Sequence, residues 1–164
     1  MKIVLATSGS RGDVQPMLAL ALGIKARGHD VLLAGPPERA GWARDIGCPY
    51  RPLGRDVTAF VDSFRSAHAP ATAVAFIRYV WEEIREQFNT LPGIISDADL
   101  VVGASLCYGL ASVAEAMGIA YRYFAFTPQL FPSAYHPYPA FKHQRLPAWC
   151  NRFGWWFMVK TDRF

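Results

Sequence analysis

The sequence has few cysteines and no long apolar run, and both absences narrow the class of protein. Its three cysteines, Cys48, Cys107 and Cys150, are odd in number and share no CxxC spacing, so they predict neither a disulfide framework nor a zinc site. No stretch approaches the roughly 20 apolar residues of a membrane span, and the apolar residues after Met1 are too few for a signal-peptide core. We therefore expect a cytoplasmic protein with no bound metal.

Several common motifs are also missing. No Gly-Lys-Ser/Thr follows the early glycines, which argues against a Walker A loop, and Gly9 and Gly12 lack the GxGxxG spacing of dinucleotide-binding proteins. Ser10 does not lie in a GxSxG elbow, since Ser8 occupies the position of the first glycine. The basic residues form no dense cluster and no RNA- or DNA-binding motif occurs, so nucleic acid is not an expected partner.

Hydrophobic residues make up 52% of the chain, which is enough for a buried core. Segments with the pattern of a strand alternate with segments that have the pattern of a helix. Buried strands are predicted over 2–6 and 30–35, and further strands over 50–53, 99–104 and 119–126. Helices are predicted over 16–28, 38–46, 56–91 and 108–117. Because strand and helix alternate along the chain, we predict an α/β fold, a Rossmann-like parallel sheet with helices on both faces.

The second part of the long predicted helix carries an apolar stripe with a spacing of three and four residues. Its members are Val74, Ile77, Trp81, Ile84, Phe88 and Leu91. The stripe predicts that this face of the helix is buried, and packing on the chain's own sheet is favoured over binding a partner. The segment 55–68 is less regular.

The stretch Thr7–Pro16 is predicted to be the loop between the first strand and the first helix. Ligands bind at this position in open α/β sheets, and the free N–H groups at a helix start carry a partial positive charge. Asp13 has two interpretations here: it caps the helix, or it acts as a general base that accepts a proton from a substrate hydroxyl. Arg11 is either a surface charge or a clamp for phosphate or carboxylate.

Several stretches resemble the amino-terminal domain of GT-B glycosyltransferases. The first is the run SGSRGDVQP at 8–16, followed by LALAL at 18–22, GHDV at 28–31 and LAGP at 33–36. The resemblance continues in DLVVGAS at 99–105, in AEAMGI at 114–119 and in Phe126-Thr127-Pro128. More narrowly, the chain is similar to the sterol and antibiotic glycosyltransferases of the family 28 type, within the UDP-glycosyltransferase superfamily.

This resemblance implies roles for the residues of the first loop. Asp13 matches the acidic residue that is the proposed base for the acceptor hydroxyl. Ser10, Arg11 and Gly12 match positions near the diphosphate of the sugar donor. Related plant-type enzymes use a histidine in this loop with an aspartate after a later strand. This chain has Asp13 and Ala104-Ser105 at those places, so that dyad is absent.

A proline-punctuated segment rich in aromatic residues follows the last predicted strand. The resemblance implies that this region shapes the acceptor pocket, with candidate residues Phe126, Thr127, Pro128, Phe131, Tyr135 and His136. A flat, apolar acceptor would suit these side chains. Packing of the aromatic residues over the sheet is an equally open interpretation.

The segment 142–164 contains five basic residues and one acidic residue, which equals the net charge of +4 of the whole chain. Tryptophan and phenylalanine residues lie between these charges. The pattern is typical of a helix on an anionic membrane surface, and it also fits a core helix whose remaining partners are absent, which we favour.

From the resemblance we expect residues 1–164 to form an incomplete amino-terminal, acceptor-binding domain, without the carboxyl-terminal donor-binding domain. The complete enzyme would be inverting and would transfer a hexose from a UDP- or dTDP-sugar, a substrate and not a cofactor, to a hydroxyl of a sterol, lipid or antibiotic aglycone. The chain alone is expected to be inactive. The alternative is a non-catalytic binding or membrane-anchoring subunit of a split glycosyltransferase, whose donor domain is a separate chain. A sugar-nucleotide epimerase is disfavoured by the aromatic segment.

Overall fold

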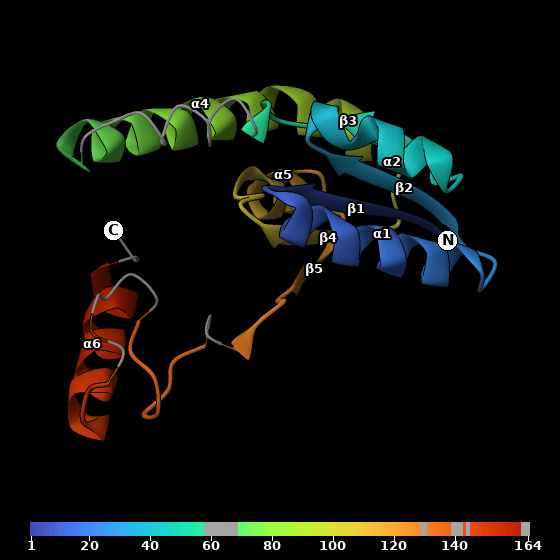
Figure 1. Ribbon diagram of the computed structural model, residues 1–164. Coiled ribbons are helices and arrows are strands. Elements are labelled where there is room, and N and C mark those ends of the chain that lie inside the picture. Colours follow the sequence, from blue (N-terminus) through green and yellow to red (C-terminus); the bar gives the residue numbers. More distant parts are fainter. Residues whose placement is uncertain (58–68, 129–130, 139–142, 144, 162–164) are drawn as a thin grey trace. The chain divides into compact units, whose positions relative to one another are not determined.

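The computed structural model describes residues 1–57, 69–128, 131–138, 143 and 145–161, and the chain divides into two compact units, Met1–Phe126 and Thr127–Phe164. The strands of the first unit are β1 (Lys2–Ser8), β2 (Asp30–Gly35), β3 (Tyr50–Pro52), β4 (Leu100–Ser105) and β5 (Ala120–Phe124). Its helices are α1 (Arg11–Lys25), the short 3-10 helix η1 (Pro37–Arg39), α2 (Ala40–Asp45), α4 (Ala69–Ile95) and α5 (Gly109–Ala116). The second unit contains α6 (Ala148–Thr161) (Figure 1).

The five strands form one parallel sheet in the order β3-β2-β1-β4-β5. From β1 the chain first moves outward to β2 and β3, and then returns to the other side of β1 to form β4 and β5. The strand order therefore reverses between β1 and β4, and the carboxyl ends of these strands border a topological switch point. Ser8 and Ser105 are register partners at this end. The predicted α/β fold with a parallel sheet is confirmed.

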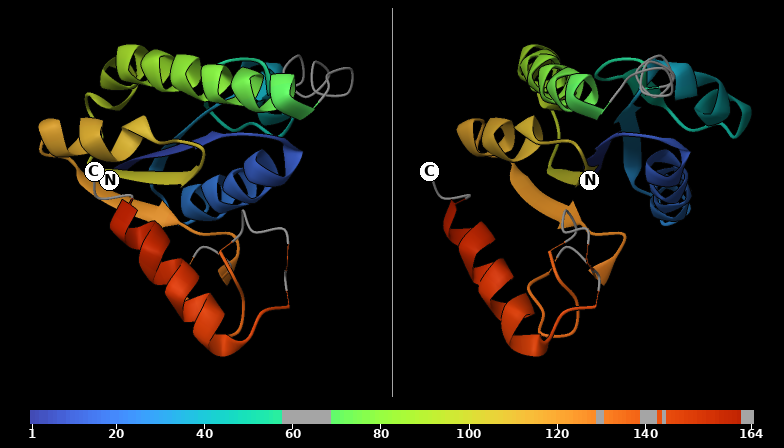
Figure 2. Two further views of the ribbon diagram at one scale, coloured as in Figure 1. Left: turned by 90° about the vertical axis from the view of Figure 1, so that its left-hand side faces the viewer. Right: turned by 60° about the vertical axis from the view of Figure 1, so that its left-hand side comes forward.

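Apolar side chains cover both faces of the central strands β1, β2 and β4, whereas the edge strands β3 and β5 are mostly exposed. On one face α1 and α2 pack against β1 and β2, with a cluster that includes Leu5, Val14, Met17, Leu33 and Ala43. On the other face α4 and α5 cover β1 and β4, with a cluster that includes Val4, Leu91, Ile95, Val101 and Leu110. Figure 2 shows α4, in green, and α1, in blue, on opposite sides of the sheet. Buried strands with apolar residues on both faces are the expected result of this layering.

Helix α1 begins at Arg11, so the prediction of a loop up to Pro16 is wrong for residues 11–16. Ser10 is the N-cap residue, and Pro16 lies inside the helix, where it lacks the N–H that would bond to the carbonyl of Gly12. Hydrophobic periodicity missed the first turn because its first residues are polar.

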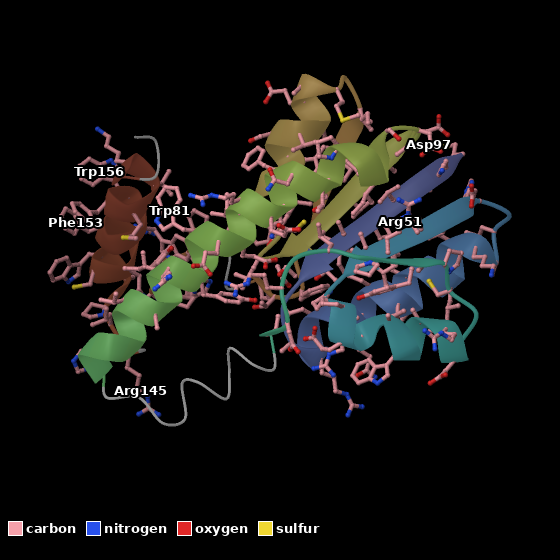
Figure 3. The ribbon with its side chains drawn as sticks, turned by 90° about the horizontal axis from the view of Figure 1, so that it is seen from above. Arg51, Trp81, Asp97, Arg145, Phe153 and Trp156 are labelled. Carbon is pink, nitrogen blue, oxygen red and sulfur yellow. The ribbon has the colours of Figure 1, made fainter. Side chains whose placement is uncertain are left out.

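The buried face of α4 differs from the predicted stripe, although Leu91, the last member of the stripe, is buried as predicted. Four members of the apolar stripe are exposed: Val74 by 68%, Ile77 by 57%, Trp81 by 68% and Phe88 by 46%. Trp81 stands out from the helix in Figure 3. The residues that face inward and are buried follow a spacing of four, at Tyr79, Glu83, Gln87 and Leu91. The apolar stripe gave the wrong face because two polar side chains, Glu83 and Gln87, are buried on the inner face and make hydrogen bonds inside the unit. The first part of the predicted helix, 58–68, lies outside the described residues.

Two substitutions on α4 distinguish its inner face from its outer face. Leu91→Ala should lower the free energy of unfolding by about 2–5 kcal/mol, because it leaves a cavity in the core. Trp81→Ala, on the exposed stripe, should change it by less than about 1 kcal/mol. Urea denaturation followed by circular dichroism measures both. An equal loss in the two variants would contradict the observed orientation of α4.

Candidate functional site

The carboxyl ends of β1 and β4 bring the side chains of Asp13 and Ser105 together. The Ser105 hydroxyl donates a hydrogen bond to Asp13 Oδ1 over 2.5 Å. The backbone N–H of Ser10 donates to Asp13 Oδ2 over 2.7 Å, and the Ser10 hydroxyl lies 3.1 Å from the same oxygen. Three donors from two segments thus fix the carboxylate, which is half-buried at the switch point. A short charge-assisted bond such as that from Ser105 is stronger than a neutral one.

Local backbone geometry makes this arrangement possible. Gly9 has a φ of +144°, and a Cβ at this position would overlap the Asp13 carboxylate. Asp13 is the third residue of α1 and bonds back to the N-cap residue, which is one half of a capping box. Asp13 therefore takes part in capping, although Ser10 is the cap residue. The role of Asp13 as a base stays a prediction.

Ser105 itself has an unusual backbone. Its φ is +52°, in the left-handed region that residues with a Cβ seldom adopt. Strained backbone of this kind persists where the surrounding structure enforces it, and it is concentrated at functional sites. The family resemblance drew attention to Ala104-Ser105 only because related plant-type enzymes have an aspartate there, which this chain lacks. In the structure its hydroxyl is the group that contacts Asp13.

Tyr123 borders the same site and was not predicted. It lies on β5, one strand beyond β4, and is 48% exposed. Burial of part of the ring and the charge of Asp13 raise the pKa of the Tyr123 phenol, while a hydrogen bond to the backbone of Ser105 acts in the opposite direction. The phenol is therefore neutral at physiological pH and can donate a hydrogen bond. Its position near the carboxyl end of the last predicted strand, 119–126, is the signal that could have found it.

The predicted diphosphate residues lie at the start of α1. Ser10 and Gly12 are exposed there. The Arg11 guanidinium lies over the ring of Trp42 at 5.5 Å, and its Nε donates to Gln15 over 3.3 Å. It therefore points along α1 toward α2, into a groove of about 340 Å³ whose lining includes Leu18, Leu22 and Ile46.

The predicted acceptor residues are divided between the two units. Phe126 ends the first unit, where it packs against the cluster beneath α1 and meets the ring of Phe124 edge to face at 5.4 Å. Thr127 and Pro128 begin the second unit. Phe131 and Tyr135 are exposed by 59% and 95%. His136 packs edge to face on Trp155 of α6, with ring centroids 5.8 Å apart, and its carbonyl accepts a hydrogen bond from the indole over 3.0 Å.

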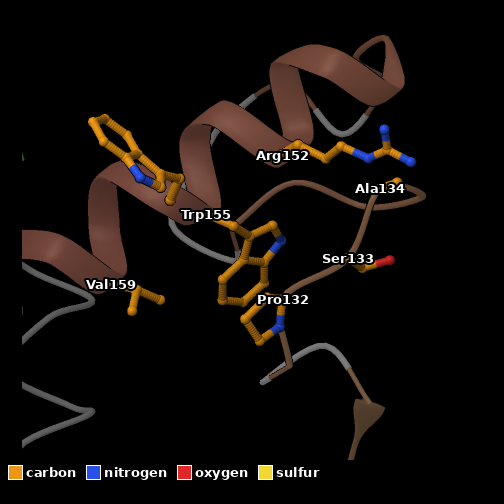
Figure 4. A pocket seen from close by; sticks show the side chains of 7 residues that line it. Pro132, Ser133, Ala134, Arg152, Trp155 and Val159 are labelled. Atoms are coloured by element: carbon orange, nitrogen blue, oxygen red, sulfur yellow. The ribbon is translucent and has the colours of Figure 1, made fainter.

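The second unit contains an apolar pocket of about 550 Å³. The pocket is lined by Pro132, Ser133, Ala134, Arg152, Trp155, Trp156 and Val159. Figure 4 shows Trp155 beside Pro132 at this pocket. Trp155 and Trp156 were not predicted as acceptor residues, although the spacing of Arg152, Trp155 and Val159 places them on one side of a helix. A pocket of this size and lining is typical of small-molecule sites.

The remaining surface of α6 exposes large aromatic side chains. Trp149 is 72% exposed, Phe153 61% and Phe157 51%, and the ammonium of Lys160 lies over the ring of Trp156 at 4.9 Å. Within the described part of the chain, no helix is long and apolar enough to cross a membrane. The membrane-surface and core interpretations of this helix both stay predictions.

Comparison with known proteins decides the family. The Glycosyltransferase family 28 N-terminal domain matches residues 3–136. The chain belongs to this family. Glycosyltransferase GtfE of Amycolatopsis orientalis is 39% identical over 146 residues, and the vancomycin aglycone glucosyltransferase of the same organism is 36% identical over 142 residues. Each alignment covers 85% of this chain and 34% of the relative, so the family 28 chain spans about a third of their length.

Solved structures support the same fold. The glycosyltransferase SsfS6 of Streptomyces sp. SF2575 has a TM-score of 0.60 and 17% identity, with 84% of this chain and 41% of that chain covered. The family 28 chain is thus a Rossmann-like amino-terminal half of a GT-B architecture.

A substitution at Gly9 tests the geometry of the Asp13 carboxylate. Gly9→Ala should lower the free energy of unfolding by about 1–3 kcal/mol, because the new methyl group overlaps the carboxylate and the backbone has a positive φ. Gly41→Ala is the matched control, since Gly41 lies in α2 with open space around its Cβ position. This control should be neutral or stabilising by up to about 1 kcal/mol. A neutral Gly9→Ala would refute the close approach of Asp13.

Proposed function

We propose that this family 28 chain is the acceptor-binding part of an inverting glycosyltransferase in which Asp13 is the general base. The observation that carries the proposal is the half-buried carboxylate of Asp13 at the switch point, fixed by Ser10 and Ser105. Ligands of open α/β sheets bind at this place, and a positioned carboxylate can accept a proton from a hydroxyl.

The hydrogen bonds indicate which oxygen would take the proton. Oδ2 accepts from the N–H and the hydroxyl of Ser10, whereas Oδ1 accepts from Ser105 and keeps a free lone pair in this set of contacts. The acceptor hydroxyl would approach Oδ1 and give up its proton there. Its oxygen would then form a bond to the anomeric carbon of the sugar from the side opposite the leaving group. The bond between that carbon and the diphosphate oxygen breaks, and the nucleoside diphosphate leaves with the electron pair.

The donor is proposed to be a UDP- or dTDP-hexose, with its diphosphate near Ser10, Arg11 and Gly12. The N-terminus of α1 carries the partial positive charge of a helix start, which favours an anion. In the structure Arg11 contacts Trp42, so its guanidinium would have to leave that ring to reach a phosphate. Most contacts to the nucleotide would come from a carboxyl-terminal donor domain, in the same chain or in a separate one.

The acceptor is proposed to be an apolar aglycone, such as a sterol, a lipid or an antibiotic core. The pocket of the second unit, lined by Pro132, Trp155 and Val159, offers the apolar surface that such a molecule needs. Phe131 and Tyr135 are sequence neighbours of the lining residues Pro132, Ser133 and Ala134. His136 contacts the lining residue Trp155. One relative is named for an antibiotic aglycone, which supports this class of acceptor.

The base is tested with Asp13→Asn in the native enzyme that carries this chain. Asparagine keeps an oxygen for the Ser10 N–H, so the helix cap and the melting temperature should be nearly unchanged. The amide cannot accept the proton, and kcat should fall about 100-fold or more. The assay uses UDP-glucose and dTDP-glucose with vancomycin aglycone and ergosterol as acceptors. Near-normal turnover by a folded variant would remove Asp13 from the reaction.

The contact from Ser105 gives a second, milder test. Ser105→Ala should lower kcat about 10-fold while KM for the sugar donor changes little, because a hydrogen bond to a charged group contributes about 1.5 kcal/mol or more. Ser105→Gly also removes the hydroxyl but suits the positive φ, so a similar loss in both variants would assign the effect to the hydroxyl and not to the backbone. If the alanine variant turned over as fast as the natural enzyme, Ser105 would have no part in orienting the base.

The second candidate is a binding or membrane-anchoring subunit of a split glycosyltransferase, which the exposed aromatic residues and Lys160 of α6 favour. An immunoblot of the source cells with an antibody against residues 1–57 distinguishes the two. A native polypeptide of about twice 18.3 kDa or more is expected for a two-domain enzyme. A band at 18.3 kDa would favour the split enzyme.

A further inference from the structure

A buried carboxylate outside the proposed catalytic residues lies close to the same end of the sheet. Glu83 of α4 is 1% exposed, and Gln87, one turn further along the helix, is fully buried. A carboxylate in this position carries a large desolvation cost that a leucine would not. Stability alone is therefore a poor reason for two polar residues on the inner face of α4.

The hydrogen bonds of Glu83 reach two distant segments. Its Oε1 accepts from the hydroxyl of Ser8, at the end of β1, over 2.6 Å and from Gln87 over 3.1 Å. Its Oε2 accepts from the backbone N–H of Arg55 over 2.9 Å. Gly54 has a φ of +74°, and a Cβ at this residue would overlap the Glu83 carboxylate. The segment after β3 is thus shaped to approach this side chain.

Gln87 extends the same network to β4 and α5. Its side-chain amide donates to the carbonyl of Leu106 over 2.9 Å, and its carbonyl accepts from the N–H of Gly109, the first residue of α5, over 2.9 Å. Leu106 directly follows Ser105 and donates its own N–H to the carbonyl of Ser8 over 3.3 Å. One pair of side chains on α4 therefore ties together the chain segments on either side of the switch point.

We propose that Glu83 is a positioning residue, which holds the Ser8 end of β1 and thereby the Gly9–Ser10 turn that presents Asp13. Gln87 does the same for the segment that follows Ser105. This inference rests on the proposed function of Asp13 for its catalytic consequence. The structural part of the inference is independent of that function, because it concerns the order of the turn.

Hydrogen exchange of the 164-residue chain tests the structural part. Glu83→Gln replaces one of the two accepting carboxylate oxygens by an NH2 group, which cannot accept from Ser8, Gln87 or Arg55, and Ser8→Ala removes one hydroxyl with little change of volume. Both should speed exchange of the Ser10 and Val14 amides, which bond to Asp13 Oδ2 and to the Ser10 carbonyl, about 10-fold. The Leu33 amide, in the core of the sheet, should keep its protection. Glu86→Gln makes the same chemical change elsewhere on α4 and should leave the exchange rates of the Ser10, Val14 and Leu33 amides unchanged.

Two results would overturn the structural part. The first is unchanged exchange of the Ser10 and Val14 amides in both variants. The second is an equal increase at Leu33, which would indicate a loss of overall stability instead of a local loosening of the turn.

Turnover of the native enzyme with UDP-glucose and vancomycin aglycone tests the catalytic part. Ser8→Ala and Glu83→Gln should lower kcat about 3- to 10-fold, with KM for UDP-glucose within twofold of the natural value. In combination with Asp13→Asn, either change should slow the enzyme no further, because both act through one carboxylate. If the fold-losses in kcat of the two single variants multiplied in the double variant, positioning through Asp13 would be refuted. If Asp13→Asn alone were fully active while the exchange result was obtained, the proposed function would fail and Glu83 would remain an organiser of the turn.

Discussion

The carboxylate of Asp13 is constrained by the segments that follow two neighbouring strands, and this constraint organises the rest of the site. Ser10 holds one oxygen through the start of α1, and Ser105 holds the other through the end of β4. These two segments follow neighbouring strands that the topology brings together only because the strand order reverses between them. The position of the carboxylate therefore depends on the register of β1 and β4, in which Ser8 lies opposite Ser105.

The same constraint explains why special backbone conformations and buried polar side chains lie close together at this end of the sheet. Gly9 provides a positive φ and leaves space for the carboxylate, whereas Ser105 adopts a positive φ despite its Cβ. Glu83 and Gln87 are buried polar groups whose cost is offset by hydrogen bonds to the segments that must be held. The backbone of Ser105 and the burial of Glu83 and Gln87 are locally unfavourable, and together with Gly9 they fix one arrangement of the two segments.

Much of the fold could be predicted from the sequence, because buried parallel strands are short continuous apolar runs. The strands 2–8, 30–35 and 100–105 follow this rule, and the resemblance carried by the SGSRGDVQP run placed Asp13 at the end of the first one. The start of α1 was missed, since Arg11, Gly12 and Asp13 are not apolar and the predicted periodicity begins only at Met17. The stripe of Val74, Ile77 and Trp81 was misassigned to the core, because apolar spacing alone cannot show that Glu83 finds partners inside. The contact from Ser105 depends on strand register and a rare backbone angle, which no local pattern encodes.

The edge of the sheet formed by β5 has a consequence for handling the first unit alone. Within the described part of the chain β5 pairs with β4 on one side only, and Tyr123 and Phe124 are 48% and 40% exposed. An edge strand with free backbone groups and exposed aromatic rings is a template for pairing with another chain. A polypeptide that ended at Phe126 would therefore be at risk of self-association through this strand. The residues that follow β5 would then matter for solubility as well as for acceptor binding.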